Sequence, residues 1–189
     1  MKDSTQLRYK AIIFDFDYTL ADSSEGIVRC TQYAFQKMGL PSADPDEIRN
    51  TIGLPLRKMY QTLTGRDVED EANLFADGFK EHSETAMAPN TFLFPSTAEV
   101  IRRLNNRGFT LGIFSTKYRR RMETILTREE LLEPFEIVVG SEDVQATKPA
   151  PEGLIKIMKE LQISAQDILF VGDSVTDAKT AQAAQVDFV

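Results

Sequence analysis

Residues 11–20, AIIFDFDYTL, decide the fold class of this chain. Residues 11–16 form a short, mostly apolar run that is rich in β-forming residues. Such a run is typical of a strand buried on both faces of a sheet. Two carboxylates, Asp15 and Asp17, lie on either side of Phe16. Like charges this close either begin the polar loop after a buried strand or belong to a reactive site at the end of the strand. The stretch alone leaves these two interpretations about equal.

Three later runs have the same apolar character and predict further buried strands. They are LGIF (111–114), EIVV (136–139) and ILFV (168–171), and the final VDFV begins a fifth candidate. Helical patterns lie between and after them, at residues 97–107, 151–161 and 174–184. Ser96 and Glu99 have the spacing of a capping box at the start of the first of these helices. Strands that alternate with helices predict a parallel sheet, so we expect an α/β, Rossmann-like core.

A helical segment interrupts this alternation. From residue 22 to residue 90 the sequence has no convincing strand pattern, and apolar stripes at helical spacing occur in 55–64 and 68–82. We therefore expect a core formed by residues 1–21 and 91–189, with an α-helical cap domain, residues 22–90, inserted after the first strand.

The composition of the chain indicates which kinds of binding partner and which cellular location to expect. The chain has 189 residues, with 22 Lys and Arg against 29 Asp and Glu, which gives a net charge of −7. Because nucleic acids and anionic membranes attract basic surfaces, we expect neither as a partner. The first ten residues lack the apolar stretch of a signal peptide, and the single cysteine, Cys30, excludes an internal disulfide. These features predict a cytoplasmic protein, which we expect to be a monomer or a weak homo-oligomer.

Four polar segments follow the predicted strands, and the carboxyl ends of parallel strands lie along one edge of a sheet. The segments are DFDYT (15–19), STK (115–117), KPAP (148–151) and GDSVTD (172–177). Carboxylates gathered in one place repel each other unless a cation joins them, and Mg²⁺ prefers oxygen ligands and pairs readily with phosphate. A lysine and a hydroxyl can hold phosphoryl oxygens, and an aspartate can be the nucleophile. The set therefore fits Mg²⁺-dependent phosphoryl transfer through a phosphorylated aspartate.

Each of these residues also has an ordinary structural explanation. Ser115 can be the polar end of a strand and Lys148 a solvated turn lysine, and for either residue alone that explanation is favoured. Asp177 can be the acid of a capping box with Ser174. Four such coincidences in the right order along the chain are improbable, so the functional interpretation is favoured for the set.

The motifs DFDYTL, FSTK, KPAP and GDSVTD resemble, in their order and spacing, those of the haloacid dehalogenase-like hydrolase superfamily. The resemblance covers essentially the whole chain and is to the subgroup with a helical cap inserted after the first strand. It implies a Rossmann-like core and Mg²⁺-dependent phosphatase activity. The dehalogenases of the superfamily lack an acid two residues after the nucleophile, so Asp17 favours phosphate-ester hydrolysis over carbon–halogen cleavage. Among capped relatives the chain looks most like the phosphoglycolate phosphatases.

The resemblance implies roles for the residues that react with or bind the phosphate. By position, Asp15 matches the nucleophile and Asp17 the general acid and base. Ser115, Thr116 and Lys148 match the phosphate-binding positions.

The resemblance also implies a metal site and its supports. The expected Mg²⁺ ligands are the carboxylates of Asp15 and Asp173 and the backbone carbonyl of Asp17. Thr19 is expected to steady the loop that follows the first strand. Asp177 is expected to support the phosphate-binding lysine.

Other residues carry expectations of their own. The segment TIGLPLR, which ends at Arg57, resembles the substrate-facing cap loop of relatives. The resemblance implies that Arg57 can meet the far end of the substrate. A solvated arginine at the start of a helix explains the residue about as well. Tyr18 occupies a position that is usually glycine in the family. His82 continues an apolar stripe and is expected to pack, half-buried. Lys117 and Arg119–Arg121 are expected to be the solvated start of a helix.

These observations favour a phosphatase that hydrolyses a small phosphate monoester of the phosphoglycolate type. A sugar phosphomutase and an inorganic pyrophosphatase use the same core and remain alternatives. A receiver-like phospho-acceptor module also combines Asp, Lys and Mg²⁺, but its acceptor normally follows a later strand and it has no long helical insert. A non-catalytic binding protein is the last alternative, and Mg²⁺-dependent turnover of an aryl phosphate would exclude it.

Overall fold

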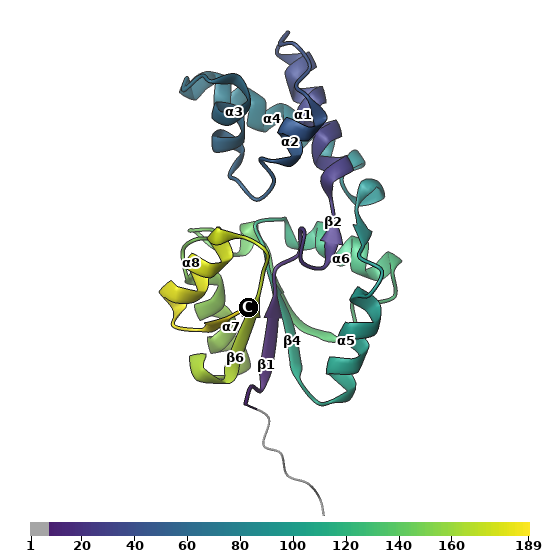
Figure 1. Ribbon diagram of the computed structural model, residues 1–189, viewed down its shortest axis with the longest axis vertical. Helices are drawn as coiled ribbons and strands as arrows, with labels where there is room; N and C mark the ends of the chain where they lie inside the picture. Colours follow the sequence, from purple (N-terminus) through teal and green to yellow (C-terminus); the bar gives the residue numbers. More distant parts are fainter. Residues whose placement is uncertain (1–7) are drawn as a thin grey trace, which may run out of the picture. The chain divides into compact units, whose positions relative to one another are not determined.

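The computed structural model describes residues 8–189 and has an α/β architecture (Figure 1). The strands are β1 Ala11–Phe14, β2 Ala21–Asp22, β3 Phe92–Leu93, β4 Thr110–Phe114, β5 Phe135–Val139, β6 Ile168–Val171 and β7 Asp187–Phe188. The α-helices are α1 Ser24–Lys37, α2 Pro45–Arg49, α3 Leu56–Thr64, α4 Glu69–Ala86, α5 Thr97–Asn106, α6 Arg119–Arg128, α7 Glu152–Leu161 and α8 Val175–Ala184, with short 3-10 helices at Ala88–Asn90, Ser141–Asp143 and Ala165–Asp167. Within residues 8–189, none of these helices has the length and apolar character needed to cross a membrane. The N-terminal residues 1–7, which the signal-peptide argument includes, lie outside the described residues.

The main sheet has five strands in the order β5-β4-β1-β6-β7, and all neighbouring strands are parallel. β1 is the central strand, where Ile12 pairs with Leu111 on one side and Leu169 on the other. All four residues of β1 are buried, as its apolar sequence predicts. This arrangement confirms the expected Rossmann-like core and places the end of β1 between strands on both sides.

Helices cover both faces of this sheet. In Figure 1, α7 and α8 lie on one side of it and α5 and α6 on the other. One face has an apolar cluster in which Ile13 and Phe170 of the sheet join Leu154 and Ile157 of α7 and Ala181 of α8. The central strand β1 is buried along its whole length, so its first polar residue, Asp15, comes only after its end.

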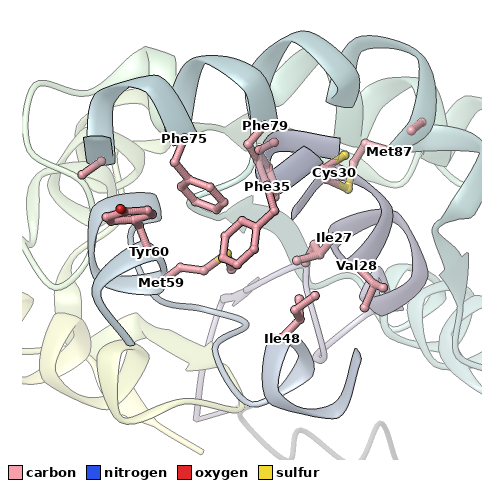
Figure 2. Close-up of a cluster of buried hydrophobic side chains, with 13 residues drawn as sticks. Ile27, Val28, Cys30, Phe35, Ile48, Met59, Tyr60, Phe75, Phe79 and Met87 are labelled. Atoms are coloured by element: carbon pink, nitrogen blue, oxygen red, sulfur yellow. The ribbon is translucent and has the colours of Figure 1, made fainter. Parts of the chain in front are cut away.

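The helical unit, Asp22–Phe92, has an apolar core of its own (Figure 2). Phe75 of α4 is fully buried in it, with ring centroids 5.7 Å from Phe35 and 5.6 Å from Tyr60. Cys30 of α1 is fully buried in the same cluster, as expected for a small apolar residue. His82 is half-buried and stacks on Tyr33 with a centroid distance of 4.5 Å, which confirms its packing role.

The chain thus forms two compact units. The second consists of the described residues up to Ala21 together with Leu93–Val189. The chain passes from one unit to the other at β2 and β3, which pair with each other in a two-stranded sheet.

The start of α5 differs from the sequence prediction. Ser96 precedes α5, but its side chain makes no cap hydrogen bond, and Glu99 instead pairs with Arg103 at 3.4 Å. The expected capping box at Ser96 is therefore wrong. At α8 the box is present, because the Ser174 hydroxyl accepts from the Asp177 N–H at 3.1 Å and the Asp177 carboxylate accepts from the Ser174 N–H at 3.1 Å.

This contrast gives a matched pair of variants. Ser174→Ala removes a side chain that accepts a helix N–H, so we expect a loss of about 1 kcal/mol in the free energy of unfolding. Ser96→Ala removes no such bond and should change it by less than about 0.5 kcal/mol. Urea denaturation followed by circular dichroism measures both. Equal losses for the two variants would show that the Ser174 cap of α8 does not stabilise the fold.

Candidate active site

The carboxyl ends of three strands position the motif residues. β1 leads directly into Asp15, β4 into Ser115, and β6 through Gly172 into Asp173. The sheet hydrogen bonds continue one residue beyond the strands, since the Asp15 N–H donates to the Val171 carbonyl at 2.8 Å and the Ser115 N–H to the Val139 carbonyl at 3.1 Å. The hydrogen bonds of the sheet therefore fix the backbone of Asp15 and Ser115.

Lys148 lies between two buried carboxylates. Its Nζ is 2.7 Å from Oδ1 of Asp15 and 2.5 Å from Oδ1 of Asp177. The side-chain exposures are 4% for Lys148, 9% for Asp15 and 0% for Asp177, so all three charges are withdrawn from water. Nζ also lies 5.8 Å from the ring centroids of Phe114 and Phe170, which wall the site. The alternative explanation of Lys148 as a solvated turn lysine is thereby excluded.

Burial dominates the protonation of this group. It raises the pKa of the Asp15 carboxyl to about 6, although the ammonium of Lys148 acts in the opposite direction. Burial alone would lower the pKa of Lys148, but the carboxylates of Asp15 and Asp177 outweigh it and raise that pKa above its ordinary value. The charged form of Lys148 is therefore favoured by its two carboxylate neighbours, whereas burial disfavours the charge on Asp15.

The acidic residues form a group that could hold a metal ion. Carboxylate oxygens of Asp15, Asp173 and Asp177 all lie within 4.8 Å of one another. Within the described part of the chain, Oδ1 of Asp15 is buried and has no partner in hydrogen-bond geometry, even though Nζ of Lys148 is near it. Thr19 lies 3.4 Å from Oδ1 of Asp173, so the loop after β1 touches this group. A donor set made only of carboxylate oxygens fits a hard divalent cation.

Asp177 has two structural duties. Its Oδ1 accepts from Lys148, and its Oδ2 accepts from the N–H and the hydroxyl of Ser174. A Cβ on Gly172 would lie only 2.7 Å from Cβ and Cγ of Asp177, so a glycine is needed for this approach. The capping-box interpretation of Asp177 is correct, and the same carboxylate also holds the lysine.

The carboxylate of Asp17 lies with a different lysine. Nζ of Lys117 is 2.9 Å from Oδ1 and 3.2 Å from Oδ2 of Asp17. Lys117 is buried, so the expectation that it begins a solvated helix is wrong; α6 begins at Arg119 instead. The position of Lys117 three residues beyond a buried strand, in the same segment as Ser115, was the available sequence signal for a site residue.

The loop after β1 contains an unusual backbone conformation. Tyr18 has φ of 62°, in the left-handed region, and its N–H donates to the Ala21 carbonyl at 2.8 Å. An L-residue is disfavoured there, which explains why a glycine suits this position. Tyr18 therefore adopts the glycine-like conformation despite its side chain, and the loop still turns back so that Asp17 bridges to Ala21.

Two predicted residues lie apart from these contacts. Thr116 follows Ser115 and is exposed. Arg57 belongs to the helical unit, where it is exposed and lies 3.3 Å from Asp67 and 3.8 Å from Glu69.

Comparisons with known proteins agree with this geometry. Residues 12–189 match the sequence profile of the haloacid dehalogenase-like hydrolases. A phosphoglycolate phosphatase of Salmonella choleraesuis is 29% identical, over 93% of this chain and 78% of the relative, and the "Probable phosphatase IndB" of Dickeya dadantii is 32% identical, over 92% and 76%. A crystal structure described as a haloacid dehalogenase-like hydrolase from Bacteroides fragilis superimposes with a TM-score of 0.89 at 39% identity, over 95% of this chain and 86% of that one. The strand-end acids, the lysine between them and the matched length together show that this chain belongs to the haloacid dehalogenase-like hydrolase family.

Proposed function

We propose that this protein is a Mg²⁺-dependent phosphatase that hydrolyses a small phosphate monoester of the phosphoglycolate type. The observation that carries the proposal is the pairing of Asp15 with Lys148 inside a group of three carboxylates at the end of the central strand. A buried nucleophile, a cation for phosphoryl oxygens and a place for a metal are the parts that phosphoryl transfer requires. The names of the relatives from Salmonella and Dickeya support the reaction class.

The proposed reaction has two steps, both at Asp15. First, a carboxylate oxygen of Asp15 attacks phosphorus, the bond to the leaving oxygen breaks, and Asp17 gives that oxygen a proton. Second, Asp17 takes a proton from a water molecule whose oxygen attacks phosphorus, and the bond from phosphorus to the Asp15 oxygen breaks. Inorganic phosphate leaves, and the carboxylate of Asp15 is restored. Lys148, with Ser115 and Thr116, stabilises the charge on the phosphoryl oxygens.

The residues that would hold the Mg²⁺ are Asp15 and Asp173 through their carboxylates and Asp17 through its backbone carbonyl. When bound, the ion offsets the repulsion between an anionic nucleophile and an anionic substrate. Asp177 lies in the same acidic group, but Lys148 and Ser174 already contact its two oxygens. We therefore assign Asp177 to the lysine and not to the metal.

We expect the helical unit to act as the cap that selects the substrate. Arg57 can offer a guanidinium to a second anionic group, such as the carboxylate of phosphoglycolate. In the free protein Arg57 lies near Asp67 and Glu69. When the substrate binds, the guanidinium of Arg57 would leave these two carboxylates and pair with the carboxylate of the substrate. Both ion pairs are exposed, so their loss costs less than about 1 kcal/mol each.

The proposal is tested by measuring kcat/KM for a panel of small phosphate monoesters, first after EDTA treatment and then with Mg²⁺ added back. We expect hydrolysis to disappear with EDTA and to return with Mg²⁺. We also expect a small ester with a second anionic group to rank above neutral esters. Product analysis separates phosphate release from transfer to a second sugar hydroxyl or from pyrophosphate cleavage. No hydrolysis of any monoester, or hydrolysis that EDTA leaves unchanged, would contradict the proposal.

A further inference from the structure

Lys117 carries a charge into the interior beside Asp17. Its side chain is 4% exposed and that of Asp17 is 18% exposed. The distances from Nζ to the two carboxylate oxygens, 2.9 and 3.2 Å, let the ammonium contact both. A buried ammonium needs a close anion, because the loss of its hydration costs several kcal/mol. The contacts with Asp17 therefore hold the Lys117 ammonium in the folded core.

The backbone of Lys117 is anchored on both sides. Its N–H donates to the hydroxyl of Ser115 at 3.3 Å, and its carbonyl accepts from the N–H of Ser141 at 3.2 Å. A Cβ on Gly140 would lie 2.2 Å from the backbone nitrogen of Arg119, so the loop after β5 packs directly against this segment. The stem of Lys117 thus starts from a rigid position, and little further entropy is lost when its ammonium contacts Asp17.

The site therefore contains two lysines that serve different acids. Lys148 contacts Asp15 and Asp177, whereas Lys117 contacts Asp17. Asp15 and Asp17 are only two residues apart, and each has its own cation. An arrangement with a single shared lysine would draw both carboxylates to one point, but here they are held at separate ones.

We infer that Lys117 is a positioning residue, which holds the carboxylate of Asp17 in the orientation from which it exchanges protons with the leaving group and with water. The inference rests on the proposed function of Asp17 as the general acid and base. Lys117 itself need not touch the substrate. A misplacement of about 1 Å in a reacting group can cost on the order of 10²-fold in rate, so the loss of the ion pair should slow the reaction by about that factor.

Two other roles for Lys117 make different predictions. If Lys117 bound the phosphate directly, its loss would weaken binding of inorganic phosphate. If it only stabilised the fold, its loss would slow the hydrolysis of all esters equally. A residue that acts through the proton donor should instead matter most for a poor leaving group, because a good leaving group departs with little help from an acid.

The test compares Lys117→Met with the wild type on two substrates, an alkyl phosphate and p-nitrophenyl phosphate, with Mg²⁺ present. We expect kcat/KM for the alkyl ester to fall by on the order of 10²-fold, and that for the nitrophenyl ester to fall much less. The Ki of inorganic phosphate should change by less than about threefold, since this change corresponds to under 1 kcal/mol. Lys117→Arg, which keeps a cation, should recover part of the rate. Lys156→Met is the matched control. It removes an exposed ion pair, in which Nζ of Lys156 lies 2.9 Å from Oε1 of Glu160, and it should leave both rates unchanged.

The same change in an Asp17→Asn background completes the design as a double-mutant cycle. Because Lys117 is inferred to act through Asp17, Lys117→Met should cause little further loss once the carboxylate is gone. Equal losses in both backgrounds, equal losses on both esters, or a large rise in the Ki of phosphate would each overturn the inference while the proposed function stands. A wild-type protein without phosphatase activity would overturn the proposed function and the inference with it.

Discussion

Asp15→Asn is expected to fold and to lose phosphatase turnover by on the order of 10⁴-fold or more, the scale seen when a covalent nucleophile is removed. The amide has nearly the shape of the carboxylate but cannot attack phosphorus. The measurement is the rate of phosphate release in Mg²⁺, together with acid-quenched trapping of a radiolabelled phosphoryl group on the protein. The wild type should carry label that hydroxylamine releases, and the variant should carry none.

The fold of this variant should be preserved, because Lys148 keeps Asp177 as a partner at 2.5 Å. We expect a melting temperature within about 4 °C of the wild type, which corresponds to about 1 kcal/mol in a chain of this size. Glu133→Gln, which neutralises an exposed carboxylate, is the control for a loss of charge. Wild-type turnover in Asp15→Asn, or label trapped on it, would show that another residue is the nucleophile.

The positions of the strands followed from local sequence. Residues 11–16 and 168–171 are short apolar runs, typical of strands in a sheet covered on both faces. The first formed β1 over Ala11–Phe14, two residues shorter than predicted, and the second formed β6 over Ile168–Val171. Once the sheet is parallel, its geometry brings the residues after these strands to one edge. For that reason Asp15 and Asp173 could be expected to meet although they are far apart in the chain, and their carboxylates lie in one group with that of Asp177.

The charge pairing within the site could not be predicted in the same way. Lys117 is one hundred residues from Asp17, and its sequence surroundings, with three arginines following, are those of a solvated segment. What buries it is tertiary: the packing of the loops after β4 and β5, and the carboxylate supplied by the loop after β1. Local patterns report propensity, and they do not report which long side chain finds an interior anion.

Backbone details also depended on context. The spacing of Ser96 and Glu99 matches a capping box, yet the Ser96 side chain makes no cap bond. At Tyr18 the loop adopts a left-handed conformation that the residue itself disfavours. In both places the tertiary structure overrides the local preference, so these features had to be observed.

Lys148→Met is expected to lose turnover and also to destabilise the fold, by about 3–5 kcal/mol, because removal of one partner leaves uncompensated buried charge. Two carboxylates, Asp15 and Asp177, lose the cation that lies 2.7 and 2.5 Å from them. The methionine retains the apolar stem between Phe114 and Phe170, so the loss reports the charge more than the packing. Urea denaturation followed by circular dichroism, in metal-free buffer, measures the change, since the chain has no tryptophan to follow by fluorescence.

The pH dependence of this loss distinguishes charge from packing. The pKa of Asp15 is already raised by burial to about 6 with Lys148 present, and it must rise further without that ammonium. A carboxyl whose pKa is higher in the folded than in the unfolded state contributes stability at low pH, and that contribution is lost as the pH rises through the folded pKa. The loss in the free energy of unfolding caused by Lys148→Met should therefore be larger at about pH 8 than at about pH 5. Adding Asp177→Asn should recover part of this loss, because one of the two unpaired carboxylates is then removed. Lys156→Met, which breaks an exposed pair, should cost less than about 0.5 kcal/mol at either pH. A deficit that is the same at both pH values would assign the role of Lys148 to packing and would remove the electrostatic basis for its place beside the nucleophile.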